Sequence, residues 1–235
     1  MTIVGLQKLT LLDYPGKVAC TVFLGGCNFR CPFCHNSQLL TADCPQLMEE
    51  AELLAFLRSR AGILEGVCIT GGEPTLQPDL PQLLRGIREL GYQIKLDTNG
   101  YRPQVLKELV AEGLVDYVAM DIKNGPAQYG MTVGLEQPDL ARIEESIRFL
   151  LEGKVAYEFR TTVAEPLHSE ASVTDMCRWL QTLGQGKKAQ KWYLQPFVDR
   201  ETVPVAGLAA PEREMLDRFL AKIALCAEEF GLRGV

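Results

Sequence analysis

Short apolar segments alternate with longer segments of helical periodicity along the whole chain. VACTVFL (18–24) and GVCIT (66–70) are rich in β-branched residues, which is typical of strands. Residues 78–91 repeat leucine and isoleucine with a period near 3.6 and end at Gly91, which is typical of an amphipathic helix. In all, the pattern predicts strands at 18–24, 66–70, 93–98, 117–123, 155–163 and 192–197, and helices at 45–60, 78–91, 103–112, 139–151, 170–183 and 211–230.

Six strand–helix pairs follow one another with no return to hairpins. Such alternation predicts a parallel sheet whose strands are joined by helical crossovers. The most loop-like stretches, 184–191 and 198–210, each join neighbouring elements, and no low-complexity tract interrupts the chain. We therefore expect a single domain over residues 1–235.

Polar residues gather where the predicted strands end. The cysteine loop follows the first strand, and polar or glycine residues end or follow the others: Gly71, Gly72, Glu73, Asp97, Thr98, Asn99, Gly100, Asp121, Lys123, Arg160, Thr161 and Gln195. Parallel α/β folds bind ligands beyond the carboxyl ends of their strands. The sequence thus predicts a partial (β/α)6 barrel, with six units in place of eight, one open side, and its site at this end.

Composition narrows the class of function. The net charge is −6 and the pI is near 5.1, which argues against nucleic-acid binding. No apolar run has the length of a membrane span, and residues 1–17 lack the features of a signal peptide, so we expect a cytoplasmic protein. In that compartment the eight cysteines are expected to be metal ligands, reactive groups or core thiols. Four of them fall among apolar neighbours in predicted elements: Cys20, Cys68, Cys177 and Cys226.

Three further cysteines lie within eight positions, at Cys27, Cys31 and Cys34. The C-x3-C-x2-C spacing lets three thiolates reach one face of a four-iron four-sulfur cluster and leaves one iron open to a substrate or cofactor. A structural zinc site with His35 or Cys44 as the fourth ligand is an alternative. An electron carrier is another, although such a protein needs complete cysteine ligation.

The segment CNFRCPFC, followed about 40 residues later by GGEP, resembles the radical S-adenosylmethionine superfamily. TLLDYPGKVACTVFLGGCNFRCPFCHNS, DTNG and MDIK are similar to glycyl-radical-enzyme activating proteins, most closely those of anaerobic ribonucleoside-triphosphate reductase and next those of pyruvate formate-lyase. The resemblance implies a 4Fe-4S cluster held by Cys27, Cys31 and Cys34. An electron from this cluster would split S-adenosylmethionine into methionine and a 5′-deoxyadenosyl radical, which would take hydrogen from a glycine of a partner enzyme. The resemblance also implies an electron donor such as flavodoxin or ferredoxin.

The same resemblance assigns residues to the cofactor pocket. Phe33 would pack on the adenine, His35 would lie beside the cluster, and Glu73 would bind the cofactor's ammonium group. Gly71 and Gly72 would let the backbone approach the methionine moiety. Asp97, Thr98 and Asp121 would hold a monovalent cation. Lys123 and Arg160 would offer positive charge to the carboxylate or the ribose side of the cofactor. Asn99 and Gly100 would shape the turn next to them.

The sequence departs from the pattern of pyruvate formate-lyase activators at two places, and both bear on which partner enzyme it would activate. Pyruvate formate-lyase activators have His in a PYH segment, whereas this chain reads LQPFVD with Val198 at that position, so that Gln195 is at best a substitute. Their DGPG is here Asp13-Tyr14-Pro15-Gly16. Both changes weaken the assignment to pyruvate formate-lyase. A small-molecule enzyme resembling 7-carboxy-7-deazaguanine synthase stays open, although an open-sided minimal barrel suits a protein loop better.

Overall fold

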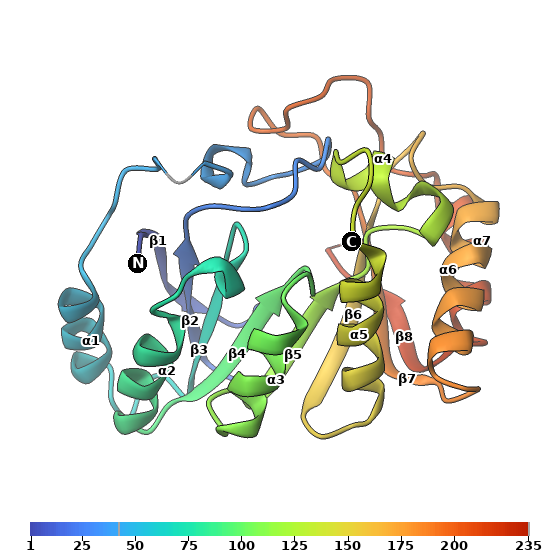
Figure 1. The fold of residues 1–235 in the computed structure, drawn as a ribbon. Helices are drawn as coiled ribbons and strands as arrows, with labels where there is room; N and C mark the ends of the chain where they lie inside the picture. The colour runs from blue at the N-terminus through green and yellow to red at the C-terminus, as the bar shows by residue number, and fades with distance from the viewer. Residues whose placement is uncertain (42, 235) are drawn as a thin grey trace. The chain divides into compact units, whose positions relative to one another are not determined.

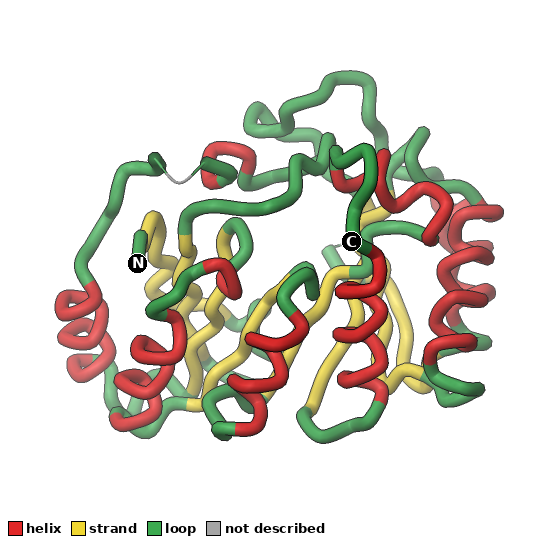
Figure 2. The backbone as a smooth tube through the Cα atoms, viewed as in Figure 1, coloured by secondary structure: helices red, strands yellow, loops and turns green. Residues whose placement is uncertain are grey.

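A computed structural model describes residues 1–41 and 43–234. Within these residues, eight strands are hydrogen-bonded to their neighbours in the order β1 to β8, and the pairings are mostly parallel (Figures 1 and 2). The strands are β1 (Ile3–Thr10), β2 (Ala19–Leu24), β3 (Gly66–Gly71), β4 (Gln93–Thr98), β5 (Tyr117–Asp121), β6 (Ala156–Val163), β7 (Ala189–Pro196) and β8 (Ala227–Leu232). The α-helices are α1 (Glu50–Ser59), α2 (Leu80–Glu89), α3 (Pro103–Ala111), α4 (Tyr129–Val133), α5 (Leu140–Leu151), α6 (Glu170–Leu183) and α7 (Arg213–Ile223). None of the helices in the described ranges has both the length and the apolar character needed to cross a bilayer.

The chain divides into two compact units, which are described separately. Unit 1 holds Met1–Asn28, Gln38–Thr98 and Arg102–Ala119. Its strand β2 pairs in parallel with β3, which pairs in parallel with β4, and β1 pairs with β2 in the antiparallel direction. Helices α1, α2 and α3 lie along one side of these strands (Figure 2). Unit 2 holds Phe29–Ser37, Asn99–Tyr101 and Met120–Val235, and its strands β6, β7 and β8 pair in parallel. The prediction of a single domain stays a prediction.

The partial (β/α)6 barrel class is confirmed. Each of the six predicted strands is present as β2 to β7, and an α-helix follows each one. The predicted bounds of 93–98 and 170–183 agree with β4 and α6 at both ends. The helix predicted at 45–60 begins later, at Glu50, because Glu49 and Glu52 form a reciprocal capping box there.

Two strands were not predicted, and the statement that the chain has no hairpin was wrong. β1 forms an antiparallel hairpin with β2, and β8 occupies residues that were assigned to the last helix. That helix ends at Ile223, so Cys226 lies in a turn and not in a helix. Both strands stand at the ends of the strand order and most of their residues are exposed or half-buried, so their sequences lack the long apolar runs of the inner strands.

The core has the predicted pattern. Leu80, Leu83, Leu84 and Ile87 of α2 are fully buried, whereas Leu90, the cap residue, is only half-buried. The four cysteines expected among core residues, Cys20, Cys68, Cys177 and Cys226, are all buried. Burial raises the pKa of Cys20 to about 12, so this thiol is protonated and inert at neutral pH.

We expect Leu84→Ala to lower the free energy of unfolding by about 2–5 kcal/mol, because the substitution leaves a cavity in a fully buried site. Leu90→Ala is the matched control on the same helix and should cost clearly less, since Leu90 is half-buried. Urea unfolding of both variants measures the difference. Equal losses would contradict this description of α2.

Candidate functional site

The cysteine loop begins in unit 1, directly after β2. Backbone hydrogen bonds hold its first residues: Gly26 N donates to Leu39 O at 2.7 Å and Cys27 N donates to Leu40 O at 3.2 Å. Gly26 has a φ of 86°, a conformation that glycine adopts without steric cost. The path of the chain into Cys27 is therefore fixed by backbone contacts.

The paired glycines after β3 lie against this part of the loop. A Cβ on Gly71 would stand 2.2 Å from Leu24 O, and one on Gly72 would stand 2.1 Å from Gly26 O. Glu73 N also donates to Gly26 O at 2.8 Å. Both positions require glycine because the backbone of the GGEP segment touches the backbone that leads into the cysteines. Their predicted contact with a methionine moiety stays a prediction.

Glu73 is buried, with 1% of its surface exposed. Its Oε1 atom accepts hydrogen bonds from Thr75 N at 3.1 Å, from the Thr75 hydroxyl, and from the Thr98 hydroxyl at 2.7 Å. These donors stabilise a carboxylate and fix its orientation. Thr98, predicted as part of a cation site, thus positions Glu73 in this structure.

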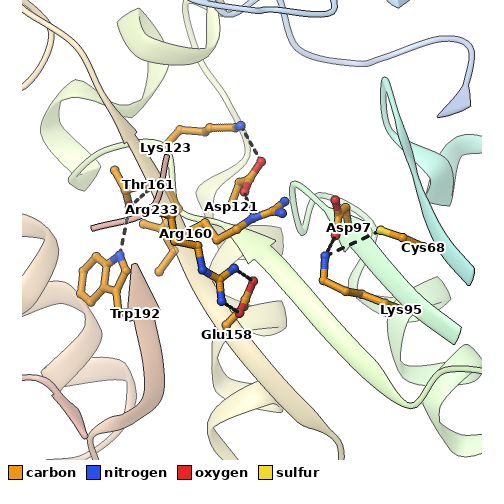
Figure 3. A network of polar contacts seen from close by, with 11 residues as sticks. Cys68, Lys95, Asp97, Asp121, Lys123, Glu158, Arg160, Thr161, Trp192 and Arg233 are labelled. Atoms are coloured by element: carbon orange, nitrogen blue, oxygen red, sulfur yellow. Dashed lines mark hydrogen bonds and ion pairs between the residues drawn. The ribbon is translucent and has the colours of Figure 1, made fainter. Parts of the chain in front are cut away.

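Asp97 forms an ion pair with Lys95, two residues earlier on the same face of β4. Lys95 is 1% exposed, and its Nζ also lies 3.7 Å from Cys68 Sγ on β3 (Figure 3). Charges are removed from water only at a considerable cost in free energy, so a buried lysine needs such a partner. Lys95 was not among the predicted site residues, although its spacing of two from Asp97 places both on one face.

The second part of the loop, in unit 2, is held against α4. Arg30 N donates to Val133 O at 2.8 Å, and Cys34 N donates to Cys31 O at 3.1 Å, which forms a turn. Gly134, which ends α4, has a φ of 68°, and a Cβ there would stand 2.3 Å from Arg30 O. Cys31 is buried and Cys34 is half-buried. Burial raises the pKa of the Cys34 thiol, and the positive charges of Lys123 and Arg30 oppose that rise.

Phe33, between the last two cysteines, is buried beside a histidine and a lysine. Its ring meets the ring of His168 edge-on at 6.3 Å, and Lys123 Nζ lies 5.9 Å from its centroid. His168 Nε2 donates to Lys123 O at 2.8 Å, while its Nδ1 accepts from Ala164 N at 3.1 Å. Burial lowers the pKa of His168, which keeps the ring neutral. His168 therefore supports both Phe33 and the backbone of Lys123.

Asp121, at the end of β5, stands between two cationic side chains (Figure 3). Lys123 Nζ lies 2.8 Å from Asp121 Oδ2, and Arg160 Nε lies 2.9 Å from Asp121 Oδ1. Burial alone would raise the pKa of Asp121, but the charges of Arg160 and Lys123 outweigh it and lower the pKa to about 2. The group as a whole carries one net positive charge.

Three further predicted residues belong to unit 2: Asn99 and Gly100, which follow β4 directly, and Gln195 of β7. Asn99 Oδ1 accepts from Tyr101 N at 3.0 Å, and Gly100, with a φ of 76°, packs on Met120; their role in the cofactor pocket stays a prediction. Gln195 is half-buried on β7, opposite Thr162 in the register.

The two residues proposed as a fourth zinc ligand have other partners. His35 stacks on Phe197 at 5.7 Å, and its Nε2 lies 2.7 Å from Val198 O. The Cys44 thiol donates to the carbonyls of Gln38 and Thr41, each at 3.0 Å. In the described residues no group of three or more His, Cys, Asp or Glu side chains is arranged to hold a metal ion.

A four-iron cluster suits the chemistry of this loop. It offers three cysteines that are not in disulfides, buried aromatic rings at Phe29 and Phe33, and a lysine near the thiols. Cys27, Cys31 and Cys34 would be its ligands. The loop thus keeps the three cysteines, after the first parallel strand, by which the sequence resembles enzymes that perform radical chemistry on S-adenosylmethionine.

Comparison with known proteins identifies the family. Residues 21–178 match the radical SAM superfamily, in which SAM is S-adenosylmethionine, and the chain belongs to it. This family uses a 4Fe-4S cluster together with S-adenosylmethionine, so both cofactors are expected here.

Relatives within the family have several activities. A Methanocaldococcus jannaschii protein named "Putative glycyl-radical enzyme activating enzyme" is 33% identical over 181 residues, which are 74% of this chain and 73% of that protein. A "Probable GTP 3′,8-cyclase" of Thermococcus kodakarensis is 33% identical over 53% of this chain and 41% of its own. The 7-carboxy-7-deazaguanine synthase of Neisseria meningitidis serogroup B is 36% identical over 46% of this chain and 45% of its own.

Solved structures agree on the fold. SuiB of Streptococcus suis, crystallised with S-adenosylmethionine, matches 91% of this chain with a TM-score of 0.67 at 14% identity. Coproporphyrinogen III oxidase of Escherichia coli matches 90% with a TM-score of 0.60 at 16% identity. This chain spans about half the length of each of those chains.

We expect Gly134→Ala to destabilise the protein and to weaken iron uptake, because it combines a strained φ with a clash against the cysteine loop. Gly153→Ala is the control, since Gly153 has a similar φ of 76° but its nearest neighbour would lie at 3.6 Å. Unfolding free energies and iron content after anaerobic reconstitution measure both effects. Equal iron content in the two variants would show that α4 does not support the loop.

We expect Asp121→Asn to destabilise the protein by roughly 2 kcal/mol at pH 7, since each tenfold change in an acid dissociation constant is worth about 1.4 kcal/mol. The folded-state pKa is lowered to about 2, so the stabilisation is present above the unfolded pKa near 4 and is lost as the pH falls toward 2.

Urea unfolding at pH 7, 5 and 3 follows this change. Asp217→Asn is the control, because its ion pair with Arg213 is exposed and should contribute little at any pH. A penalty for Asp121→Asn that is as large at pH 3 as at pH 7 would argue against the charge pairing.

Proposed function

We propose that this chain is an activating enzyme of a glycyl-radical enzyme. The observation that carries the proposal is the extent of the similarity to the Methanocaldococcus jannaschii relative, which covers nearly three quarters of both proteins. The small-molecule enzymes match only about half of this chain and less than half of their own. A shared activity is better supported by a match along most of both chains than by one confined to the motifs of the family.

In this proposal Cys27, Cys31 and Cys34 bind the cluster through three of its irons. When bound, the reduced cluster supplies the electron that cleaves S-adenosylmethionine to methionine and a 5′-deoxyadenosyl radical. Glu73 is already oriented by Thr75 and Thr98, and it would bind the ammonium group of the cofactor. The net positive charge of Asp121, Lys123 and Arg160 would favour the cofactor carboxylate.

The proposed partner is anaerobic ribonucleoside-triphosphate reductase, and pyruvate formate-lyase is the second candidate partner. The support is the residue-level resemblance in the cysteine loop and the absence of the PYH segment, where LQPFVD stands instead. A flavodoxin or ferredoxin would be the electron donor. The other class of function is a small-molecule enzyme, favoured by the 36% identity to 7-carboxy-7-deazaguanine synthase over 108 residues.

We expect the anaerobically reconstituted and reduced protein to form 5′-deoxyadenosine from S-adenosylmethionine, and we expect Cys31→Ala to abolish it. Cys44→Ala is the matched control, because Cys44 donates to backbone carbonyls and is not a proposed ligand. Chromatography of the product and iron analysis give the result. Uptake of one zinc, with metal loss in the Cys44 variant, would show a structural zinc site instead.

The partner is identified by electron paramagnetic resonance. Mixing with anaerobic ribonucleoside-triphosphate reductase should produce a glycyl radical signal that is absent when the target glycine of the reductase is replaced by alanine. A signal with pyruvate formate-lyase alone would change the partner. Formation of 7-carboxy-7-deazaguanine, with no glycyl radical on either enzyme, would overturn the proposed function.

A further inference from the structure

Lys95, in the middle of β4, carries a positive charge into the interior of unit 1. The residue is 1% exposed, and its Nζ forms an ion pair with Oδ1 of Asp97 (Figure 3). A buried ion pair adds little to stability, because the desolvation of both groups offsets their attraction. Stability alone therefore does not account for a lysine at this position.

The geometry of the strand directs this ammonium group to Asp97. Successive residues of a strand point to opposite sides, so Lys95 and Asp97 lie on the same face of β4. Cys68 stands opposite Lys95 in the parallel register of β3 and β4, and its Sγ lies 3.7 Å from the lysine Nζ. The lysine stem thus reaches toward the carboxyl end of the strand and places its charge at the Asp97 carboxylate.

The resemblance assigned a monovalent cation to Asp97, Thr98 and Asp121, and in unit 1 the two assigned residues already have protein partners. Asp97 is paired with the ammonium group of Lys95. The Thr98 hydroxyl donates to Glu73 Oε1 at 2.7 Å and orients that carboxylate. Hard cations are held by oxygen ligands, among which carboxylates supply the negative charge. At Asp97 that charge is balanced by a lysine.

Asp121, the residue of unit 2 assigned to the same cation, is compensated twice. One oxygen of its carboxylate is paired with Lys123 and the other with Arg160. A sodium or potassium ion at this carboxylate would be repelled by both cationic side chains, since like charges a few ångströms apart destabilise each other. The contacts of both carboxylates therefore do not suit the cation that the resemblance implies.

We propose that the Lys95 ammonium group takes the place of a monovalent cation beside Asp97, so that the protein binds S-adenosylmethionine without sodium or potassium. The inference rests on membership of the radical SAM superfamily and not on the identity of the partner enzyme. A bound ion exchanges with solvent and depends on the salt present. A lysine is covalently attached, so the positive charge beside Asp97 is a fixed part of β4.

The first test uses the wild type in the chlorides of sodium, potassium and tetramethylammonium, a cation too large for a small-ion site. Anaerobic calorimetry measures the affinity of the reconstituted protein for S-adenosylmethionine, and urea unfolding without S-adenosylmethionine measures stability. At equal ionic strength charge screening is the same, so we expect both constants to differ by less than about twofold among the salts. A larger gain with sodium or potassium would overturn the proposal, and this measurement needs no variant.

The second test removes the ammonium group with Lys95→Met, which keeps an unbranched side chain and makes room for an ion at Asp97. We expect sodium or potassium to raise the folding equilibrium constant of this variant roughly tenfold over tetramethylammonium, as a ligand does at about ten times its dissociation constant. Lys154→Met is the matched control, because Lys154 also pairs with a carboxylate two residues away, that of Glu152, but at the surface. No preference among the salts is expected for the control.

The outcomes separate this proposal from a merely structural ion pair. A loss of stability in Lys95→Met that is equal in all three salts would show that the pair only supports the fold, and the proposal would be wrong. A cation requirement of the wild type would also refute it and would leave the proposed function intact, since the glycyl radical signal tests that function separately. A reconstituted wild type that binds no S-adenosylmethionine in any salt would refute both.

Discussion

The cysteine loop depends on close backbone contacts that only glycine permits. Its first part is approached by Gly72, where a Cβ would lie 2.1 Å from Gly26 O, and its second part by Gly134, where a Cβ would lie 2.3 Å from Arg30 O. Side chains vary in rotamer, whereas backbone contacts of this kind allow almost no adjustment. A loop that must present three thiols with fixed separation gains its precision from such contacts, since ligands held on rigid supports keep their geometry.

Charged groups are buried in both units, and burial of charge is a poor way to stabilise a fold. In unit 1 Lys95 is paired with Asp97 and Glu73 accepts hydrogen bonds from threonine donors, and in unit 2 Glu158 is paired with Arg233. Glu158 is fully buried and accepts two hydrogen bonds from Arg233, at 2.5 and 2.6 Å (Figure 3). The Arg233 guanidinium also lies 3.9 Å from the centroid of the Tyr193 ring. Each of these buried charges is accordingly held by a partner of opposite charge or by hydrogen-bond donors.

The sequence predicted β2 to β7 and the helices that follow them. Each of these elements has a buried apolar side, which appears in the sequence as a periodic pattern of apolar residues. The sequence pattern did not predict β1 and β8, the strands at the two ends of the strand order. AEEFGL in β8 contains residues that favour helices, and only pairing with β7 makes it a strand. At the site, motifs pointed to the cysteines and Glu73, but Lys95 carried no local signal. Its burial beside Cys68 of β3 depends on the pairing of two strands and therefore on tertiary structure.

His168 shows what such a tertiary contact implies. It lies in the loop before α6, where its ring contacts Phe33 and the Lys123 backbone, and the next residue, Ser169, caps α6. The start of a fourteen-residue helix and the aromatic residue between two cysteines are therefore linked through one imidazole. Because His168 contacts Phe33 and directly precedes the cap of α6, the packing of Phe33 and the start of this helix depend on the same residue.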